Sequence, residues 1–106
     1  SGNSPEQLVT EQLTLMQEFG EALTKVTDEA SAEQHKDAVE KIVRKMNALR
    51  REHRWLSEQE RKACLAVGKE LGPELQAAQG KMKSELARIQ PSADIQRVLG
   101  PSLEML

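Results

Sequence analysis

The sequence predicts an all-α protein, an antiparallel up-down-up three-helix bundle with a kinked third helix and a short C-terminal helical segment. One heptad-like seam runs through the middle of the chain, where apolar or histidine residues alternate at spacings of four and three. Its members are His35, Val39, Ile42, Met46, Leu49, His53 and Leu56. Capping-box sequences begin at Ser4, Ser31 and Ser57, which predicts three helix starts. The 106 residues are enough for one domain, residues 1–106.

The first helix is predicted over about 5–27. Ser4 has the character of an N-cap, Pro5 suits the first helical position, and Gln7 can reach back to the cap. A broad apolar face follows, comprising Leu8, Val9, Leu13, Leu15, Met16, Phe19, Ala22, Leu23 and Val26. Gly20 lies within this helix, where it costs about 1 kcal/mol relative to Ala. A glycine there either allows the close approach of a neighbouring helix or is incidental.

The second helix is predicted over about 32–55, with Ser31 as its N-cap and the seam as its buried face. Its connection to the first helix is only about four residues, so the two helices should be antiparallel neighbours. Residues 1–30 hold six acidic residues and one basic residue, whereas residues 31–62 hold nine basic and six acidic residues. This polarity favours antiparallel pairing of the two helices.

The sequence around Ser57 has two interpretations. A capping box from Ser57 to Glu60 indicates that the second helix ends and a third begins at once. Alternatively, one continuous helix of about fifty residues could run through, because the apolar positions after Ser57 stay almost in phase with the seam. Such a helix would need a partner chain to cover it. We favour the break.

The third helix is predicted over about 58–90, with a kink near Pro73 because proline lacks the amide that a helix interior requires. The apolar phase continues across Pro73, which favours a kink over two separate helices. After Gln90-Pro91 a short helix is predicted over about 92–99. Leu103, Met105 and Leu106 should then cover one end of the bundle, with a frayed tail as the alternative.

The stretch Val26-Thr27-Asp28-Glu29-Ala30-Ser31-Ala32, preceded by residues 15–23, resembles a group of small helical bacterial proteins. Members of this group are typically exported or lipoprotein-like and have no assigned activity. The resemblance covers most of residues 6–90 and implies a periplasmic or extracytoplasmic location, with a cytoplasmic one left open. The group tends to carry prolines at the second turn, where this chain has residues 55–58. No catalytic residue is carried over.

The start of the chain, Ser1-Gly2-Asn3, has no initiator Met and is typical of a processed or engineered N-terminus. A removed signal peptide or lipid anchor is therefore an open expectation, and it is the only membrane attachment we expect. No apolar run approaches the roughly 18 residues that span a bilayer.

We expect no catalytic residue, metal, cofactor or small-molecule substrate. His35 and His53 lie about 27 Å apart along one helix, so they cannot share a metal ion. Cys64 is the single cysteine, lies on an apolar stripe and should behave as a small buried hydrophobe. Methionines at helical spacing are usual core residues, and two aromatic residues are few for packing a haem.

The candidate interaction surface is a basic set of residues around the second turn. It comprises Arg50, Arg51, His53, Arg54, Trp55, Arg61 and Lys62. Arginine and tryptophan together are the residue types enriched among interface anchors. The expected function is thus a non-catalytic helical scaffold or protein-interaction module, whose partner the sequence does not name. The alternatives are a self-assembling coiled coil and a binder of an anionic surface. The acidic net charge and the lack of stacking aromatics argue against nucleic acid.

Overall fold

The computed structural model describes residues 3–106, in which five helices and no strand are present. The helices are α1 (Pro5–Thr24), α2 (Glu29–Arg54), α3 (Glu58–Glu70), α4 (Gly72–Ile89) and α5 (Ala93–Leu103). The prediction of an all-α protein is confirmed. The molecule is elongated, with Cα extents of 45 × 26 × 17 Å. The predicted start at Ser1 and Gly2 lies outside the described residues.

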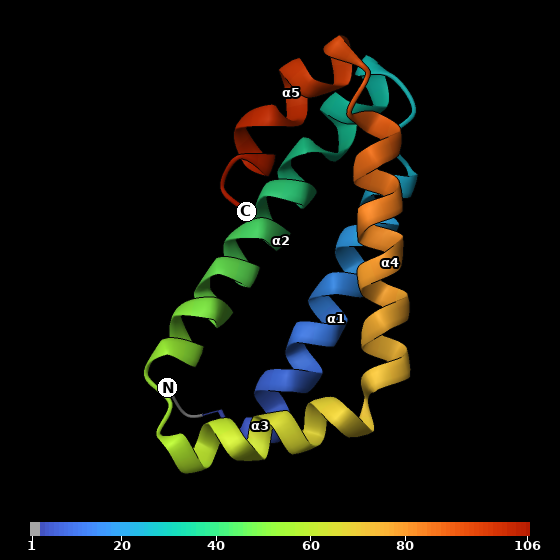
Figure 1. The fold of residues 1–106 in the computed structure, drawn as a ribbon. Coiled ribbons are helices and arrows are strands. Elements are labelled where there is room, and N and C mark those ends of the chain that lie inside the picture. Colours follow the sequence, from blue (N-terminus) through green and yellow to red (C-terminus); the bar gives the residue numbers. More distant parts are fainter. Residues whose placement is uncertain (1–2) are drawn as a thin grey trace.

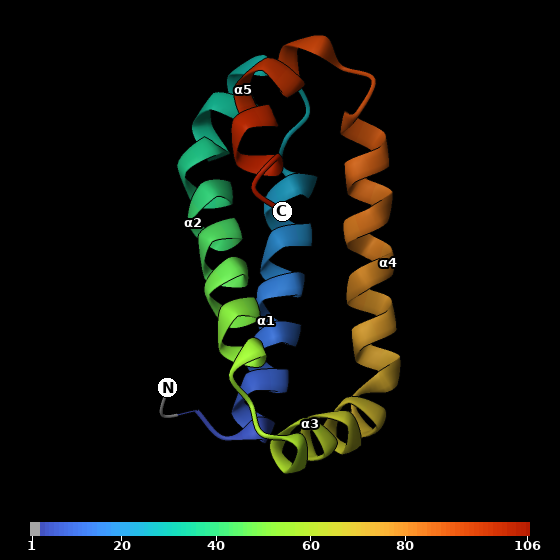
Figure 2. The same ribbon diagram turned by 60° about the vertical axis from the view of Figure 1, so that its left-hand side comes forward.

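The helix α1 lies between α2 and α4 and contacts both (Figures 1 and 2). The chain runs along α1, returns along α2, crosses the end of the molecule in α3, and runs along α4 in the direction of α1 (Figure 1). The helix α5 then folds back and packs on α2. We call the two ends of the molecule the α5 end, which also holds the α1–α2 connection, and the α3 end.

The hydrophobic core is concentrated at the α5 end. Its larger cluster consists of Phe19, Leu23, Val26, Ala32, Val39, Val43, Ile89, Ile95, Val98 and Leu99. A smaller cluster of Leu8, Leu15 and Leu49 lies toward the α3 end. Within the predicted seam, Val39 is fully buried, whereas Ile42 and Met46 are only partly buried because the buried face of α2 includes Val43 instead.

Two of the three predicted capping boxes form. At Ser4, the Gln7 amide donates to Ser4 Oγ (3.2 Å) and the Ser4 amide donates to Gln7 Oε1 (2.9 Å). At Ser57, the Glu60 amide donates to Ser57 Oγ (3.1 Å) and the Ser57 amide donates to Glu60 Oε1 (2.9 Å). The chain therefore breaks between α2 and α3, and the continuous fifty-residue helix is wrong.

The predicted start of the second helix at Ser31 is wrong by three residues. Asp28 is the N-cap of α2, because its Oδ1 accepts from the Ser31 amide (2.8 Å) while Ser31 Oγ accepts from the Asp28 amide (3.0 Å). Ser31 thus occupies the third helical position of the same capping box. The first helix ends at Thr24 rather than at 27, although Val26 in the connection is still fully buried.

The single kinked helix predicted over 58–90 is wrong, because residues 58–89 form two helices that meet at Leu71. Pro73 lies in the first turn of α4, where a missing amide breaks no intrahelical hydrogen bond. The division turns α3 across the end of α1 (Figure 1). There the Cys64 thiol donates a weak hydrogen bond to the Pro5 carbonyl at 3.7 Å.

The last helix is longer than predicted, since α5 continues through Pro101 to Leu103 instead of ending near 99. Ser92 caps it as expected, accepting from the Ile95 amide at 3.2 Å. Leu103 and Met105 pack against the larger cluster, and the Asn47 side-chain amide donates to the Met105 carbonyl at 2.8 Å. This packing holds the helix together across the proline, so the frayed-tail alternative is wrong.

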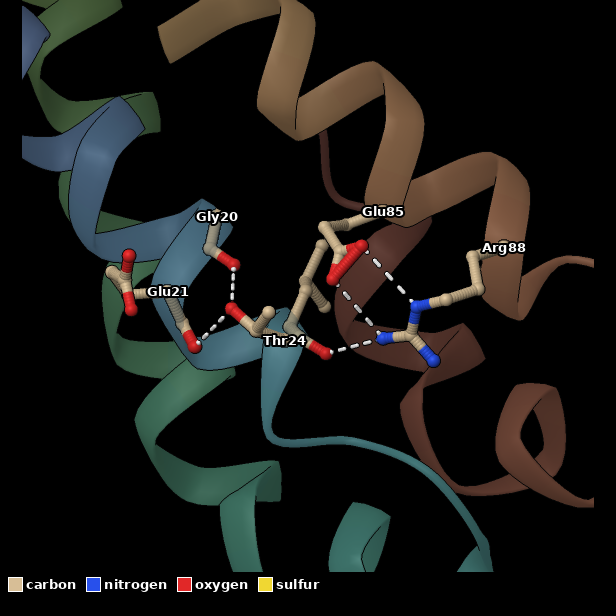
Figure 3. Close-up of polar contacts among 6 residues, drawn as sticks. Gly20, Glu21, Thr24, Glu85 and Arg88 are labelled. Atoms are coloured by element: carbon tan, nitrogen blue, oxygen red, sulfur yellow. Dashed lines mark hydrogen bonds and ion pairs between the residues drawn. The ribbon is translucent and has the colours of Figure 1, made fainter.

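Several contacts join α1 to α4, among them an exposed ion pair between Lys81 and Glu21. Gly20 is buried and faces Lys81, whose Cγ would lie 3.2 Å from a Cβ at position 20, so the glycine leaves room for this side chain of α4. Arg88 Nη2 donates to the Leu23 carbonyl (2.8 Å), and Arg88 is itself paired with Glu85 (Figure 3). Because α1 has no basic residue in its last turn, Arg88 supplies a positive charge at the negative end of its dipole.

Candidate interaction surface

The basic set predicted from sequence lies at the α3 end but is divided between two faces. Arg50 and His53 line a hollow together with residues of α1 and α4. Arg51 and Trp55 line a different hollow, beside Asn3 and the α2–α3 connection. Successive residues of a helix are about 100° apart, so neighbours such as Arg50 and Arg51 must face different ways.

The other three members of the set are Arg54, Arg61 and Lys62, of which Arg61 and Lys62 contact residues close to them in the chain. Arg61 Nη2 donates to the Arg54 carbonyl at 3.2 Å, which satisfies a carbonyl at the C-terminus of α2. Lys62 lies 3.9 Å from Glu58 one turn earlier in α3, and both side chains are exposed. Such an exposed pair holds Lys62 weakly.

A groove lies between α2 and α4, with α1 as its floor. Its first part has a volume of about 450 Å³ and an apolar lining drawn from all three helices: Leu15, Met16, Met46, Leu49 and Met82. Its polar lining consists of Gln12, Arg50, His53 and Gln79. Methionine side chains are flexible and polarizable, so three of them make an adaptable apolar surface.

The groove continues toward α3. Its second part has a volume of about 530 Å³ and shares Gln12 and His53 with the first. The apolar lining here comprises Val9, Cys64, Leu65, Gly68 and Leu75, with Arg61 and Lys69 beside them. We use the name groove for both parts together.

The charges along the groove have one sign. Arg50, Arg61 and Lys69 line it, and no Asp or Glu is among the lining residues that the structure describes. Ion pairs within residues 3–106 involve other cations, namely Arg44, Lys62, Lys81, Arg88 and Arg97. No ion pair joins α1 to α2 in that range, so the acidic residues of the first helix do not pair with the arginines at the end of α2.

His53 and Cys64 are the groove residues with reactive side chains. His53 Nε2 is enclosed and has no hydrogen-bond partner in the described part of the chain. The pKa of the Cys64 thiol is raised by burial and, to a smaller extent, by the nearby Glu60 carboxylate, so the thiol stays protonated. The predicted role of Cys64 as a buried hydrophobe fits its exposure of 7 %.

Two large apolar side chains are exposed at the same end. Trp55 is 88 % exposed and Leu65 is 67 % exposed. Single exposed apolar residues are common, but these two occur beside unpaired arginines. Exposed tryptophan and arginine are typical of interface anchors.

The groove brings in residues that the predicted interaction surface did not include, namely Gln12, Met16, Leu65, Lys69, Leu75, Gln79 and Met82. Leu65 could have been noticed from the sequence, because a leucine beside the apolar stripe of Cys64 and Val67, rather than on it, should be exposed. Met16, Leu75 and Met82 lie on predicted apolar faces, but their meeting in one groove could not be inferred because it depends on the turn of the chain at Leu71.

Within residues 3–106, no three His, Cys, Asp or Glu side chains are grouped so that they could hold a metal ion. No helix in this range has the length and apolar character needed to cross a membrane. Comparison with protein-family models, curated proteins and solved structures finds no match. The resemblance of residues 26–32 to small exported bacterial proteins therefore stays a prediction, and function must be argued from the geometry.

Proposed function

We propose that this chain is a non-catalytic protein-interaction module that binds an acidic partner protein at its α3 end. Helices α1, α2 and α4 would act as an up-down-up frame that holds this end in place. The observation that carries the proposal is the combination of exposed Trp55 with Arg51 and Arg54, neither of which has an ion-pair partner among residues 3–106.

The physical argument concerns the charge on these arginines. Three arginines within five residues repel one another, and although Glu52 and Glu60 lie nearby, neither forms an ion pair with these arginines among residues 3–106. A partner that brings carboxylates gains charge-assisted hydrogen bonds to the guanidinium groups and association speeded by electrostatic attraction. The indole of Trp55 adds a large apolar contact at little cost in side-chain entropy.

The test is site-specific photo-crosslinking in an extract of the source cells. A photoreactive amino acid at position 55 should give a discrete adduct, whereas the same group at Gln34, exposed in α2 toward the α5 end, should not. The double variant Arg51→Glu and Arg54→Glu should abolish the adduct, and added salt should weaken it because exposed charges are screened. Equal adducts at both positions, or adducts indifferent to charge reversal, would overturn the proposal.

Two alternatives give different outcomes in the same study. If the adduct at position 55 is a second copy of this chain, and light scattering gives a mass above the 11.8 kDa monomer, the function is self-assembly. If no protein adduct forms but the chain floats with anionic vesicles and not with neutral ones, the partner is a membrane surface. The position of Trp55 beside arginines favours the membrane alternative, since tryptophan prefers the membrane interface and basic residues prefer anionic lipid.

A further inference from the structure

We infer that the groove between α2 and α4 is a docking site for a short amphipathic helix whose flanks are acidic. This inference rests on the proposed function and names the form of the partner. The groove lies on a different face from Trp55 and Arg51, so experiments can contradict the inference and the proposed function separately. Three features of the groove carry it: its continuity with α5, its apolar floor and the sign of its charges.

The first feature is that a helix, α5, already packs on α2 and shares an apolar cluster with the end of α4. At the α5 end, Ile95, Val98 and Leu99 of α5 share the larger core cluster with residues of α1, α2 and α4. The helix α5 runs beside α2 (Figure 1), and the segment after it reaches Asn47, in the last third of α2, whose side-chain amide donates to the Met105 carbonyl. The groove begins at Met46, next to Asn47. It therefore starts where the C-terminal segment stops covering α2, and it extends from there toward the α3 end.

The second feature gives the length and the apolar face of the occupant. The groove extends from Met46 to His53 along α2 and from Leu75 to Met82 along α4, about 10 Å in each case. This length suits about two helical turns, or about seven residues in contact with the groove, which is shorter than the 11 residues of α5. Met16, Met46 and Met82 converge from three helices, and methionine-lined grooves adapt to the apolar face of a bound helix.

The third feature gives the charge of the occupant. Arg50 lies in one part of the groove, Arg61 and Lys69 lie in the other, and no carboxylate lines either part within residues 3–106. Glutamates on both flanks of a docked helix would face these cations. His53 lines both parts of the groove, at their junction.

The test uses a capped 14-residue peptide with leucines at i, i+3, i+4 and i+7 and glutamates on the flanks. Protein with ¹³C-labelled methionine methyl groups should show shifts at Met16, Met46 and Met82. Met105, which packs against the core outside the groove, is the internal control. A scrambled peptide of the same composition, and one with lysine in place of glutamate, should bind at least about tenfold more weakly.

Charge reversal locates the binding. Arg50→Glu and Lys69→Glu should each weaken the peptide by about fivefold or more at low salt. Lys45→Glu, an equal charge change at an exposed position of α2 outside the groove, should change the affinity by less than about twofold. Circular dichroism of each variant should show unchanged helicity, since all three positions are exposed.

Several results would overturn the inference. These are no binding of the acidic peptide at millimolar concentration, shifts at Met105 or the Trp55 indole without shifts in the groove, or equal binding of the scrambled peptide. Groove shifts produced by anionic vesicles or by self-association in place of the peptide would also overturn it. A charge-dependent adduct at position 55 together with no peptide binding would support the proposed function and contradict only the inference about the groove.

Discussion

The two ends of this molecule are built differently although the same long helices reach both. At the α5 end, Phe19, Val39 and Leu99 are fully buried, and Arg88 and Arg97 are paired with carboxylates. At the α3 end the apolar cluster is small, and Trp55 and Leu65 are exposed beside unpaired arginines. This difference indicates that the stability of the fold comes mainly from the α5 end. The side chains at the α3 end are therefore available for contacts outside the chain.

The largest test of this comparison is core truncation at each end. Phe19→Ala should lower the free energy of unfolding by about 3–5 kcal/mol, because it leaves a cavity in the larger cluster. Leu49→Ala, in the smaller cluster beside half-buried Met46, should cost about 2–3 kcal/mol because its surroundings can relax and admit water. Urea unfolding followed by far-ultraviolet circular dichroism measures both. An equal or larger loss at Leu49 would contradict the comparison.

The second test removes the link between α1 and α4 at the α5 end. Arg88→Met keeps the aliphatic part of the side chain but removes its hydrogen bonds to the Leu23 carbonyl and Glu85, and should lower stability by about 1–3 kcal/mol. Lys81→Met, which removes an exposed ion pair to Glu21, is the matched control and should cost less. Thermal melts of the two variants decide the order, and a greater loss at Lys81 would reverse it.

The third test uses acid. Backbone and side-chain hydrogen bonds to Ser31 lower the pKa of Asp28, and equivalent bonds to Ser57 lower the pKa of Glu60. A carboxyl whose folded pKa lies below its unfolded pKa stabilises the fold at neutral pH, and this stabilisation is lost as pH falls through the folded value.

We expect the two caps to differ in the extent of the structure they support. Asp28→Asn should lower global stability at pH 7 and flatten its fall toward acid, because Asp28 begins α2 beside the larger core. Glu60→Gln should increase hydrogen exchange in α3 and leave the slowest-exchanging amides unchanged. Exchange measured by NMR between pH 7 and pH 4 checks both, and a global effect of Glu60→Gln would show that α3 unfolds together with the core.

The smallest expected effect is at the basic end of α2. Replacing Arg50, Arg51 and Arg54 together by Gln should change stability by no more than about 0.5 kcal/mol, because the lost interaction with the C-terminal end of the α2 dipole is offset by the removal of mutual repulsion and no ion pair is lost. Arg97→Gln at the α5 end, which loses contacts to Glu29 and Asp94, should instead lower the melting temperature slightly. Marked destabilisation of the triple variant would mean that these arginines serve the fold.

Local signals in the sequence predicted the all-α class and the helix starts at Ser4 and Ser57, because a capping box is formed by residues only three positions apart. Local signals failed where two choices were chemically equivalent. Asp28 and Ser31 are both good N-caps, and the structure uses them as the two halves of one box. Pro101 looked like a helix end, yet packing of Leu103 on the core carries α5 past it.

The division at Leu71 could not be predicted from the apolar pattern, since that pattern keeps its phase through Pro73 whether the helix kinks or divides. The candidate site depends on that division. Sequence reasoning found Arg50, His53 and Arg61 as members of one basic set, but it could not separate the groove face from the face of Trp55. Lys69 joins them only because α3 turns across the end of α1.

The central position of α1 has a consequence for how the protein is made. Every helix that contacts α1 follows it in the chain, and Phe19 shares its cluster with Ile89 of α4 and Leu99 of α5. During translation α1 can pack against α2 once α2 has left the ribosome, but the part of its apolar face that α3 and α4 cover stays exposed until those helices follow, because contacts so distant in sequence cannot form earlier. We expect the core at the α5 end to close last, since its cluster includes residues of α4 and α5.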